Sequence, residues 1–215
     1  LRGNIYYGNR YTYQTGNPFL KPIINQDLIF SASYKWVNFS FTYNRTKDDI
    51  IQVCEPYSEA DPTISLLKTV NTEPYNNIIS AITLSPTISW WSPQLTAQVF
   101  KQWLHAEGPD GKLTLSNTRT IIVWRNSFTL PAGFLFDVDG TYYTKGHSQN
   151  MYMGINSLDV SMGLYKSFFK ERLSFQLQVT NLLEKDDVDC TIYSGIKTMT
   201  DYITNFRRIS LTMRY

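Results

Sequence analysis

Long runs in which apolar and polar residues alternate are the feature that most constrains this chain. The first run extends from Leu28 to Trp36, and the last from Arg208 to Tyr215. Successive side chains of a β-strand point to opposite faces, so a period of two predicts strands with one apolar and one polar face. We count about nine such strands from Asp27 onward. A helical period competes only near residues 66–70, and the chain is therefore predicted to be all-β.

The connections between these strands alternate in length. Short turns are predicted at 35–38, 91–93, 130–133 and 168–172, and long polar connections at 52–75, 105–117, 145–151 and 184–200. In an antiparallel up-and-down order, this alternation places every short turn at one end of the sheet and every long loop at the other. Outer-membrane barrels sort their loops in this way, with short periplasmic turns and long extracellular loops.

Strand length and aromatic residues favour a transmembrane barrel as well. Runs such as 75–91 and 151–168 exceed the roughly 9–11 tilted residues that cross a bilayer. Aromatic residues gather near strand ends, as expected for the girdles at the two membrane interfaces: Trp36, Trp90, Trp91, Phe128, Phe134, Phe168, Phe169 and Tyr215. The alternative is that these large rings fill the core of a soluble sandwich. No run reaches the roughly 18 apolar residues of a spanning helix, but barrels lack such runs too.

Composition excludes few other classes. The net charge of +2 gives no reason to expect a nucleic-acid partner, and no basic block is present. Cys54 and Cys190 have no metal-type spacing; both are expected near the external side, and whether they form a disulfide stays open. The chain begins at Leu1 without a visible signal peptide, so we expect a segment of a longer protein. An odd strand count with two unpaired edges predicts further barrel strands upstream.

Several motifs resemble one family. "GNPFLKP" (residues 16–22) precedes a strand and the residues "YKW", and "SWWSPQLTAQV", "FTLPAGFLFDVDGTY", "LYKSFFKERLSFQLQVTNLLE" and "RRISLTMRY" follow in order. This set is similar to the C-terminal barrel portion of TonB-dependent-receptor-like outer-membrane proteins of Gram-negative bacteria, and it covers most of the chain. Ile23 departs from the pattern, because the family often has an acidic residue there.

The resemblance implies a role in transport across the outer membrane. Such receptors are barrels of 22 strands filled by an N-terminal plug domain, and they take up scarce nutrients with energy relayed by TonB. The expected organisation is an extracellular loop over residues 1–26 and barrel strands over 27–215. The expected partners are outer-membrane lipid and, outside this segment, the plug and the TonB system. A surface lipoprotein is a further candidate partner. The substrate could be a glycan, a peptide or a metal chelate.

Two other functions remain open at this point: a soluble or surface-attached all-β carbohydrate-binding module, and a passive porin. The direction of the apolar rows discriminates the soluble module from the barrel, because in a sandwich they would meet a second sheet. No enzyme is expected, since His105 and His147 have no nucleophile or carboxylate at a recognisable spacing. No motif for a cofactor or a metal is present.

Candidate site residues are of two kinds. Polar-row charges are expected to face the lumen of the barrel, where water or partners meet them: Asp137, Asp139, Asp159, Arg208 and Arg214. Aromatic residues of the long loops, represented by Tyr57 and Tyr193, are candidates for stacking on an external ligand. Lys101 lies on the apolar row and is expected near the outer rim, where its ammonium group can reach water.

Overall fold

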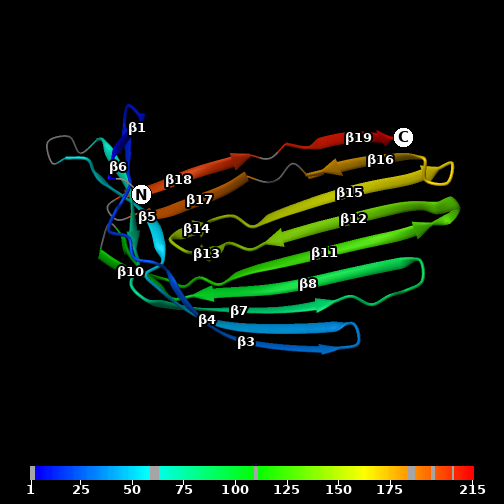
Figure 1. Ribbon diagram of the computed structural model, residues 1–215, viewed down its shortest axis with the longest axis horizontal. Helices are drawn as coiled ribbons and strands as arrows, with labels where there is room; N and C mark the ends of the chain where they lie inside the picture. The colour runs from blue at the N-terminus through cyan, green and yellow to red at the C-terminus, as the bar shows by residue number, and fades with distance from the viewer. Residues whose placement is uncertain (1–2, 59–62, 109–110, 184–186, 195–196, 205) are drawn as a thin grey trace.

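A single antiparallel sheet of nine strands makes up most of the molecule (Figure 1). The computed structural model describes residues 3–58, 63–108, 111–183, 187–194, 197–204 and 206–215. The strands of the sheet are β3 (Ile24–Tyr34), β4 (Val37–Lys47), β7 (Tyr75–Leu84), β8 (Trp91–Gln102), β11 (Arg119–Leu130), β12 (Phe134–Tyr143), β15 (Ser157–Phe168), β16 (Leu173–Thr180) and β19 (Arg208–Arg214). Their spatial order follows the chain, which confirms the predicted antiparallel up-and-down arrangement.

The two ends of the sheet differ in the length of their connections, as the sequence predicted. One end, the turn end, carries the short turns and the C-terminus, whereas the other, the loop end, carries every long connection (Figure 1). Lys35 and Trp36 alone join β3 to β4, and Lys35 has a φ of 51°. The one-turn 3₁₀ helix η1 (Pro131–Gly133) joins β11 to β12. Left-handed backbone at such positions lets a short connection reverse the chain.

The β7–β8 connection lies a few residues before its predicted place. β7 ends at Leu84, so the turn spans 85–90 rather than 91–93, and the predicted single run 75–91 is wrong. Pro93 lies inside β8 opposite Asn126 of β11. The pairing of β8 with β7 ends at Leu95, two residues after Pro93. On the side of β8 that faces β7, the Trp91 N–H donates instead to the carbonyl of Ile88 in the connection. Pro93 therefore lies where β8 needs no N–H donor on that side.

The predicted long loops are largely built of strands. The regions taken as polar connections form hairpins and small sheets at the loop end: β1 (Ile5–Asn9), β2 (Thr12–Thr15), β5 (Ile50–Pro56), β6 (Ser65–Asn71), β9 (Leu104–Gly108), β10 (Gly111–Leu115), β13 (Gly146–Ser148), β14 (Met151–Met153), β17 (Asp187–Ser194) and β18 (Lys197–Thr204). Their Thr, Tyr, Val and Ile content suits strands, although their alternation is too short to read from sequence. The expected run 151–168 is likewise two strands, β14 and β15. β3 begins at Ile24.

The register separates an apolar from a polar face. One row crosses six strands through apolar residues: Phe39, Ile82, Ala97, Ile122, Tyr142 and Leu158. The neighbouring row, on the other face, is mostly polar: Asn38, Thr83, Thr96, Val123, Thr141 and Asp159. Thr83 and Thr96 hydrogen-bond across this row, with 3.0 Å between their hydroxyl oxygens. The period of two in the sequence therefore corresponds to a difference in polarity between the two faces of the sheet.

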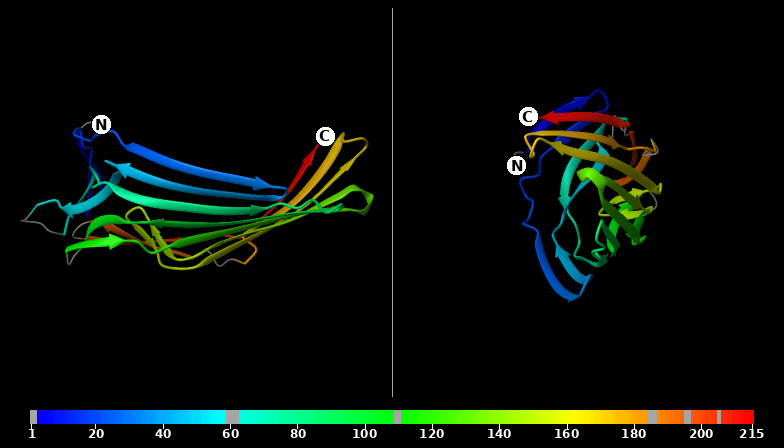
Figure 2. Two further views of the ribbon diagram at one scale, coloured as in Figure 1. Left: turned by 90° about the horizontal axis from the view of Figure 1, so that it is seen from below. Right: turned by 90° about the vertical axis from the view of Figure 1, so that its right-hand side faces the viewer.

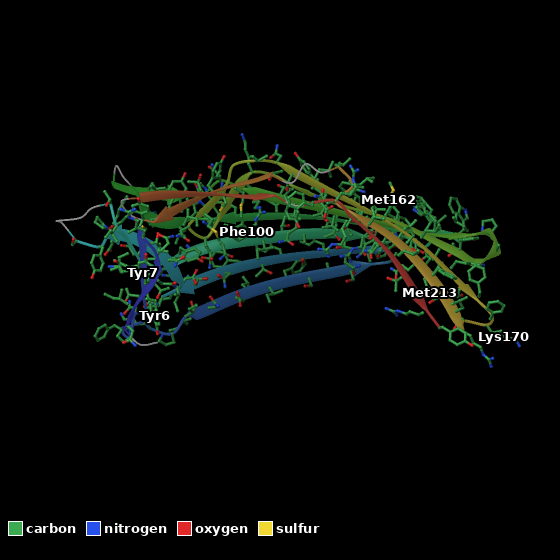
Figure 3. The ribbon with its side chains drawn as sticks, turned by 90° about the horizontal axis from the view of Figure 1, so that it is seen from above. Tyr6, Tyr7, Phe100, Met162, Lys170 and Met213 are labelled. Carbon is green, nitrogen blue, oxygen red and sulfur yellow. The ribbon has the colours of Figure 1, made fainter. Side chains whose placement is uncertain are left out.

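The apolar face is not covered by a second sheet in the described part of the chain. The sheet is curved into an open trough (Figure 2, right), and Met162 of the apolar rows projects from its convex side (Figure 3). Ile82 and Leu177, on strands inside the sheet, are 41% and 42% exposed. The buried apolar cluster lies instead at the loop end, around Tyr75, Leu104 and Leu115. The sandwich alternative is therefore wrong.

The polar rows face the concave side at the loop end. Asn44 and Asn77 of these rows line a hollow of about 380 Å³ together with Gln149, which belongs to the β13–β14 hairpin. Among the described residues there is no helix long and apolar enough to cross a bilayer.

Aromatic rings cluster on the apolar face near the turn end. Phe128 lies between Trp91 and Phe136, with ring centroids 6.3 and 6.0 Å apart. Nearby, the Lys166 ammonium lies 4.9 Å from the Phe134 ring centroid and 5.5 Å from that of Phe168. A tryptophan among phenylalanine rings and a lysine that reaches past them fit the position where an apolar band meets headgroups.

Candidate functional site

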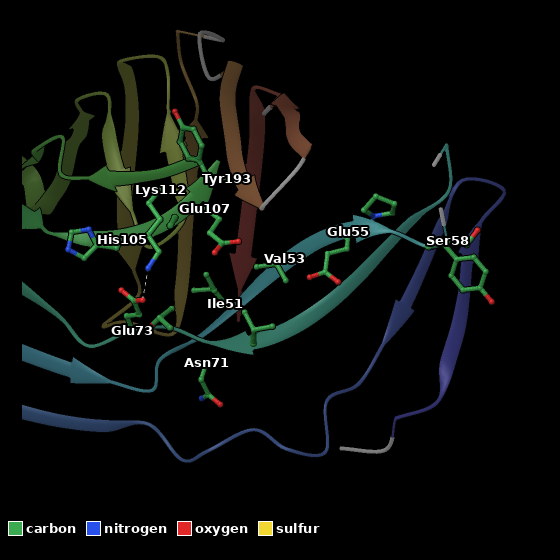
Figure 4. Close-up of a pocket in the computed structure, with 15 residues that line it drawn as sticks. Ile51, Val53, Glu55, Ser58, Asn71, Glu73, His105, Glu107, Lys112 and Tyr193 are labelled. Carbon is green, nitrogen blue, oxygen red and sulfur yellow. Dashed lines mark hydrogen bonds and ion pairs between the residues drawn. The ribbon is translucent and has the colours of Figure 1, made fainter. Parts of the chain in front are cut away.

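A cavity of about 800 Å³ opens among the hairpins of the loop end (Figure 4). One wall is the β5–β6 hairpin and another is the β9–β10 hairpin. The lining residues of β5 include Ile51, Val53 and Glu55, which alternate and so share one face of that strand. Lys112 of β10 reaches toward Glu73, which follows β6 (Figure 4). This cavity is the candidate site.

The charged groups of the cavity are mostly carboxylates. The Lys112 ammonium donates a hydrogen bond to Glu73 Oε1 at 2.8 Å, and Lys68 pairs with Glu55 at 2.6 Å. The hydrogen bond from Lys112 holds the pKa of Glu73 below its usual value and correspondingly raises the pKa of Lys112. Both partners of that pair are exposed, so the pair orders the rim rather than adding much stability. Glu107 lies on the same wall as Lys112.

Both aromatic candidates from the sequence, Tyr57 and Tyr193, line this cavity. The ring of Tyr57 meets Tyr13 edge-on, with 4.8 Å between centroids, and the ring of Tyr193 lies 5.9 Å from His147. Composition alone indicated aromatic loops, but it did not indicate the carboxylates beside them. The only signal for Glu73 and Lys112 would have been their pairing across 39 residues, which a single sequence does not reveal.

The charged candidates of the polar rows lie elsewhere, on the sheet. Asp137 and Asp139 alternate along β12, and Asp139 is opposite Arg125 of β11. Asp159 of β15 is opposite Thr141, and its buried Oδ1 has no hydrogen-bond partner in the described part of the protein. The edge strand β19 holds the remaining two, since Arg208 is opposite Thr180 and Arg214 is opposite Ser174. All five lie on the polar face, and none lines the cavity.

A network of amide side chains holds the hairpins of the loop end together. Gln102 Nε2 donates to the Gln149 carbonyl at 2.7 Å, and the Gln149 N–H donates to Gln102 Oε1 at 2.9 Å. Asn150 Nδ2 donates to the carbonyls of Gln52 and Tyr193 at 2.9 and 3.0 Å. The network links β5, β8 and β17 through residues that are 43–98 positions apart. Each bond contributes about 1 kcal/mol, and together they fix the cavity's position above the sheet.

The two cysteines both lie on strands of the loop end. Cys54 on β5 and Cys190 on β17 are both buried, and they are not joined by a disulfide in this structure. Within the ranges that the structure describes, no group of three or more His, Cys, Asp or Glu side chains is arranged to hold a metal ion.

His147 is a buried, uncharged link in the loop end. Its side chain is 6% exposed, and its Nδ1 accepts a hydrogen bond of 2.9 Å from the Asn117 N–H. Burial lowers the pKa of His147. Protonation of Nδ1 would remove this acceptor as well as place a charge among the rings of Tyr152 and Tyr193.

Acidification is therefore expected to loosen the loop end. Between the lowered folded pKa of His147 and the unfolded value of about 6.5, the unfolded state binds more protons. The stability from neutral His147 is complete above about pH 6.5 and declines as the pH falls below it. The protection factors of the amides of Asn117 and Tyr152, which correct for the slower intrinsic exchange at lower pH, should fall between pH 7.5 and 5.5. His147→Gln should remove this pH dependence and His105→Gln should retain it; equal behaviour of both variants would contradict the assignment.

The comparisons with known proteins agree with this architecture. A family model described as the outer membrane protein beta-barrel family matches residues 1–215. No curated protein and no solved structure matches the chain. An antiparallel up-and-down sheet with an uncovered apolar convex face is also what a strand wall in lipid requires. The chain belongs to the outer membrane protein beta-barrel family and lies in the outer membrane of a Gram-negative bacterium.

Proposed function

We propose that this chain is part of a TonB-dependent-type receptor that takes up a nutrient through the outer membrane. The observation that carries the proposal is the cavity of about 800 Å³ at the loop end, the same end at which a smaller hollow opens on the polar rows of the sheet. In an outer-membrane barrel the long connections are extracellular. A ligand captured there would stand at the entrance to the lumen, as uptake requires.

The segment 16–22, which carries the receptor-like motif, supports the proposal by its position. Asn17 Nδ2 donates to the Thr69 carbonyl at 3.0 Å, and the Lys21 N–H donates to Asn71 Oδ1 at 2.8 Å. Asn71 in turn donates to the Lys21 carbonyl at 3.0 Å and also lines the cavity. Pro18 and Pro22 cannot donate to a strand ladder, which suits a connection held by side chains. The motif thus ties the start of β3 to a wall of the cavity.

The rest of the transport machinery would come from other parts of the receptor. β3 is exposed along its whole length and β19 along most of it, and both are edges of the sheet. Further strands are proposed to pair with these edges and close the barrel. The polar rows would meet an N-terminal plug; they include Asp159 Oδ1 and Arg119 Nε, which have no hydrogen-bond partner among the described residues. Energy would come from TonB.

Energy dependence distinguishes the receptor from a passive porin. Cells that produce the full-length protein are expected to accumulate its substrate against a gradient, and to stop when TonB is deleted or the proton-motive force is collapsed. Uptake should be measured at low external concentration with a radiolabelled nutrient mixture, against cells that lack the gene. Uptake that follows the outside concentration and continues without TonB would identify a porin instead.

A further inference from the structure

We propose that the loop-end cavity binds short peptides that carry both an aliphatic side chain and a cationic group, in preference to glycans and anionic metal chelates. The inference rests on the proposed receptor function and specifies its substrate class. It is drawn from the aliphatic wall of the cavity, its unbalanced carboxylate and one buried hydroxyl.

The apolar part of the cavity includes a wall of aliphatic side chains. Ile51 and Val53 project from β5, and Val70 of β6 and Ala106 of β9 complete this part of the lining. Branched aliphatic side chains leave narrow hollows that suit leucine-like groups, whereas sugar rings stack best on flat aromatic faces. Tyr193 and Ser58, the neighbour of Tyr57, lie at opposite ends of the cavity (Figure 4). The two tyrosines therefore do not form a paired platform for a sugar ring.

The charge of the cavity favours a cation. The pairs Lys112–Glu73 and Lys68–Glu55 neutralise two carboxylates. Glu107 also lines the cavity; it lies directly opposite Lys112 in the β9–β10 pair but forms no ion pair with a described side chain, so three carboxylates stand against two ammonium groups. This excess of one negative charge in a partly enclosed cavity attracts an ammonium or guanidinium group and repels an anionic chelate.

A buried hydroxyl completes the site. Thr72 is 9% exposed, its Oγ1 has no hydrogen-bond partner in the described part of the protein, and the residue lines the cavity. The Thr72 N–H donates to the Asp49 carbonyl at 2.7 Å, so the residue is held by its backbone while its buried hydroxyl makes no hydrogen bond within the described fold. Buried polar groups are rarely left without a partner. A peptide supplies both an N–H and a carbonyl for this hydroxyl.

Calorimetric titration of the intact, detergent-purified protein tests the proposal. The probe is a tetrapeptide of two leucines and two lysines, and its matched control has glutamates in place of the lysines. The lysine peptide should bind, and the glutamate peptide should bind at least roughly five-fold more weakly. Glu107→Gln should weaken the lysine peptide roughly three- to five-fold, and Thr72→Val roughly five-fold. Glu171→Gln, a carboxylate change in the turn after β15, should have no effect.

The outcomes separate this inference from the proposed function. Equal binding of the two peptides, or no effect of Glu107→Gln with the fold verified by circular dichroism, would overturn the peptide assignment. Tighter binding of a neutral oligosaccharide or a ferric catecholate that Thr72→Val abolishes would also overturn it, while the receptor function would stand. Peptide binding that behaves as expected, with uptake independent of TonB, would support the site and overturn the receptor.

Discussion

Ala97→Arg is expected to lower the free energy of unfolding of the full-length protein in lipid vesicles by about 2–4 kcal/mol. Ala97 lies near the middle of β8, on the apolar face, between Ile82 and Ile122. An arginine at that depth must place its charge in hydrocarbon or distort the bilayer, because neither interface is close enough for its side chain to reach easily. The measurement is a denaturant titration of the vesicle-inserted protein, followed by tryptophan fluorescence.

Gln98→Arg is the matched control. Gln98 is the next residue, at nearly the same depth, but it lies on the polar face between Ala81 and Ile121. An arginine there enters the wet interior, and its effect should stay within about 0.5 kcal/mol. Equal losses for the two variants would show that the convex face does not meet lipid, and a larger loss for Gln98→Arg would reverse the assignment of the faces.

The sheet could be predicted because its information is local. In a run such as Leu28 to Trp36, the polarity of each residue indicates which face of the sheet its side chain is on. Nine such runs, with a short turn between every other pair, are compatible with few strand orders. The β7–β8 turn was misplaced because the apolar alternation continues past Leu84 to Trp90, through a proline. Periodicity indicates which side chains are apolar, but it does not indicate the residue at which the backbone hydrogen bonds to the neighbouring strand end.

The cavity could not be predicted because its information is not local. Glu73 meets Lys112 and Asn150 meets Gln52 only after separate hairpins have packed against one another. The loop strands are short and mostly polar, so their pairing depends on register and tertiary contact rather than on alternation. Tyr57 and Tyr193 were found because aromatic loops are conspicuous in composition. The residues that give the cavity its charge are ordinary surface types until the fold brings them together.

A methyl group on Gly140 is expected to cost about 1–3 kcal/mol of stability, because the indole of Trp124 occupies that space. Gly140 of β12 is directly opposite Trp124 of β11, on the apolar face. A Cβ atom on Gly140 would lie 2.0 Å from Cζ2 and 2.1 Å from Cε2 of the indole, far inside contact distance. Gly140→Ala should therefore drive Trp124 out of its rotamer and lower the denaturation midpoint in vesicles.

A double-mutant cycle identifies the indole as the cause. Gly140→Ala should be nearly neutral in a Trp124→Ala background, which gives a coupling energy of about 1–3 kcal/mol between the two positions. Gly163 of β15 is the matched control, since a Cβ there would meet only Asp137, with 3.8 Å to the nearest atom. Gly163→Ala should change stability by less than about 0.5 kcal/mol. If Gly140→Ala cost the same with and without Trp124, the loss would arise in the backbone of β12, and the packing of the indole over the glycine would not be what fixes this register.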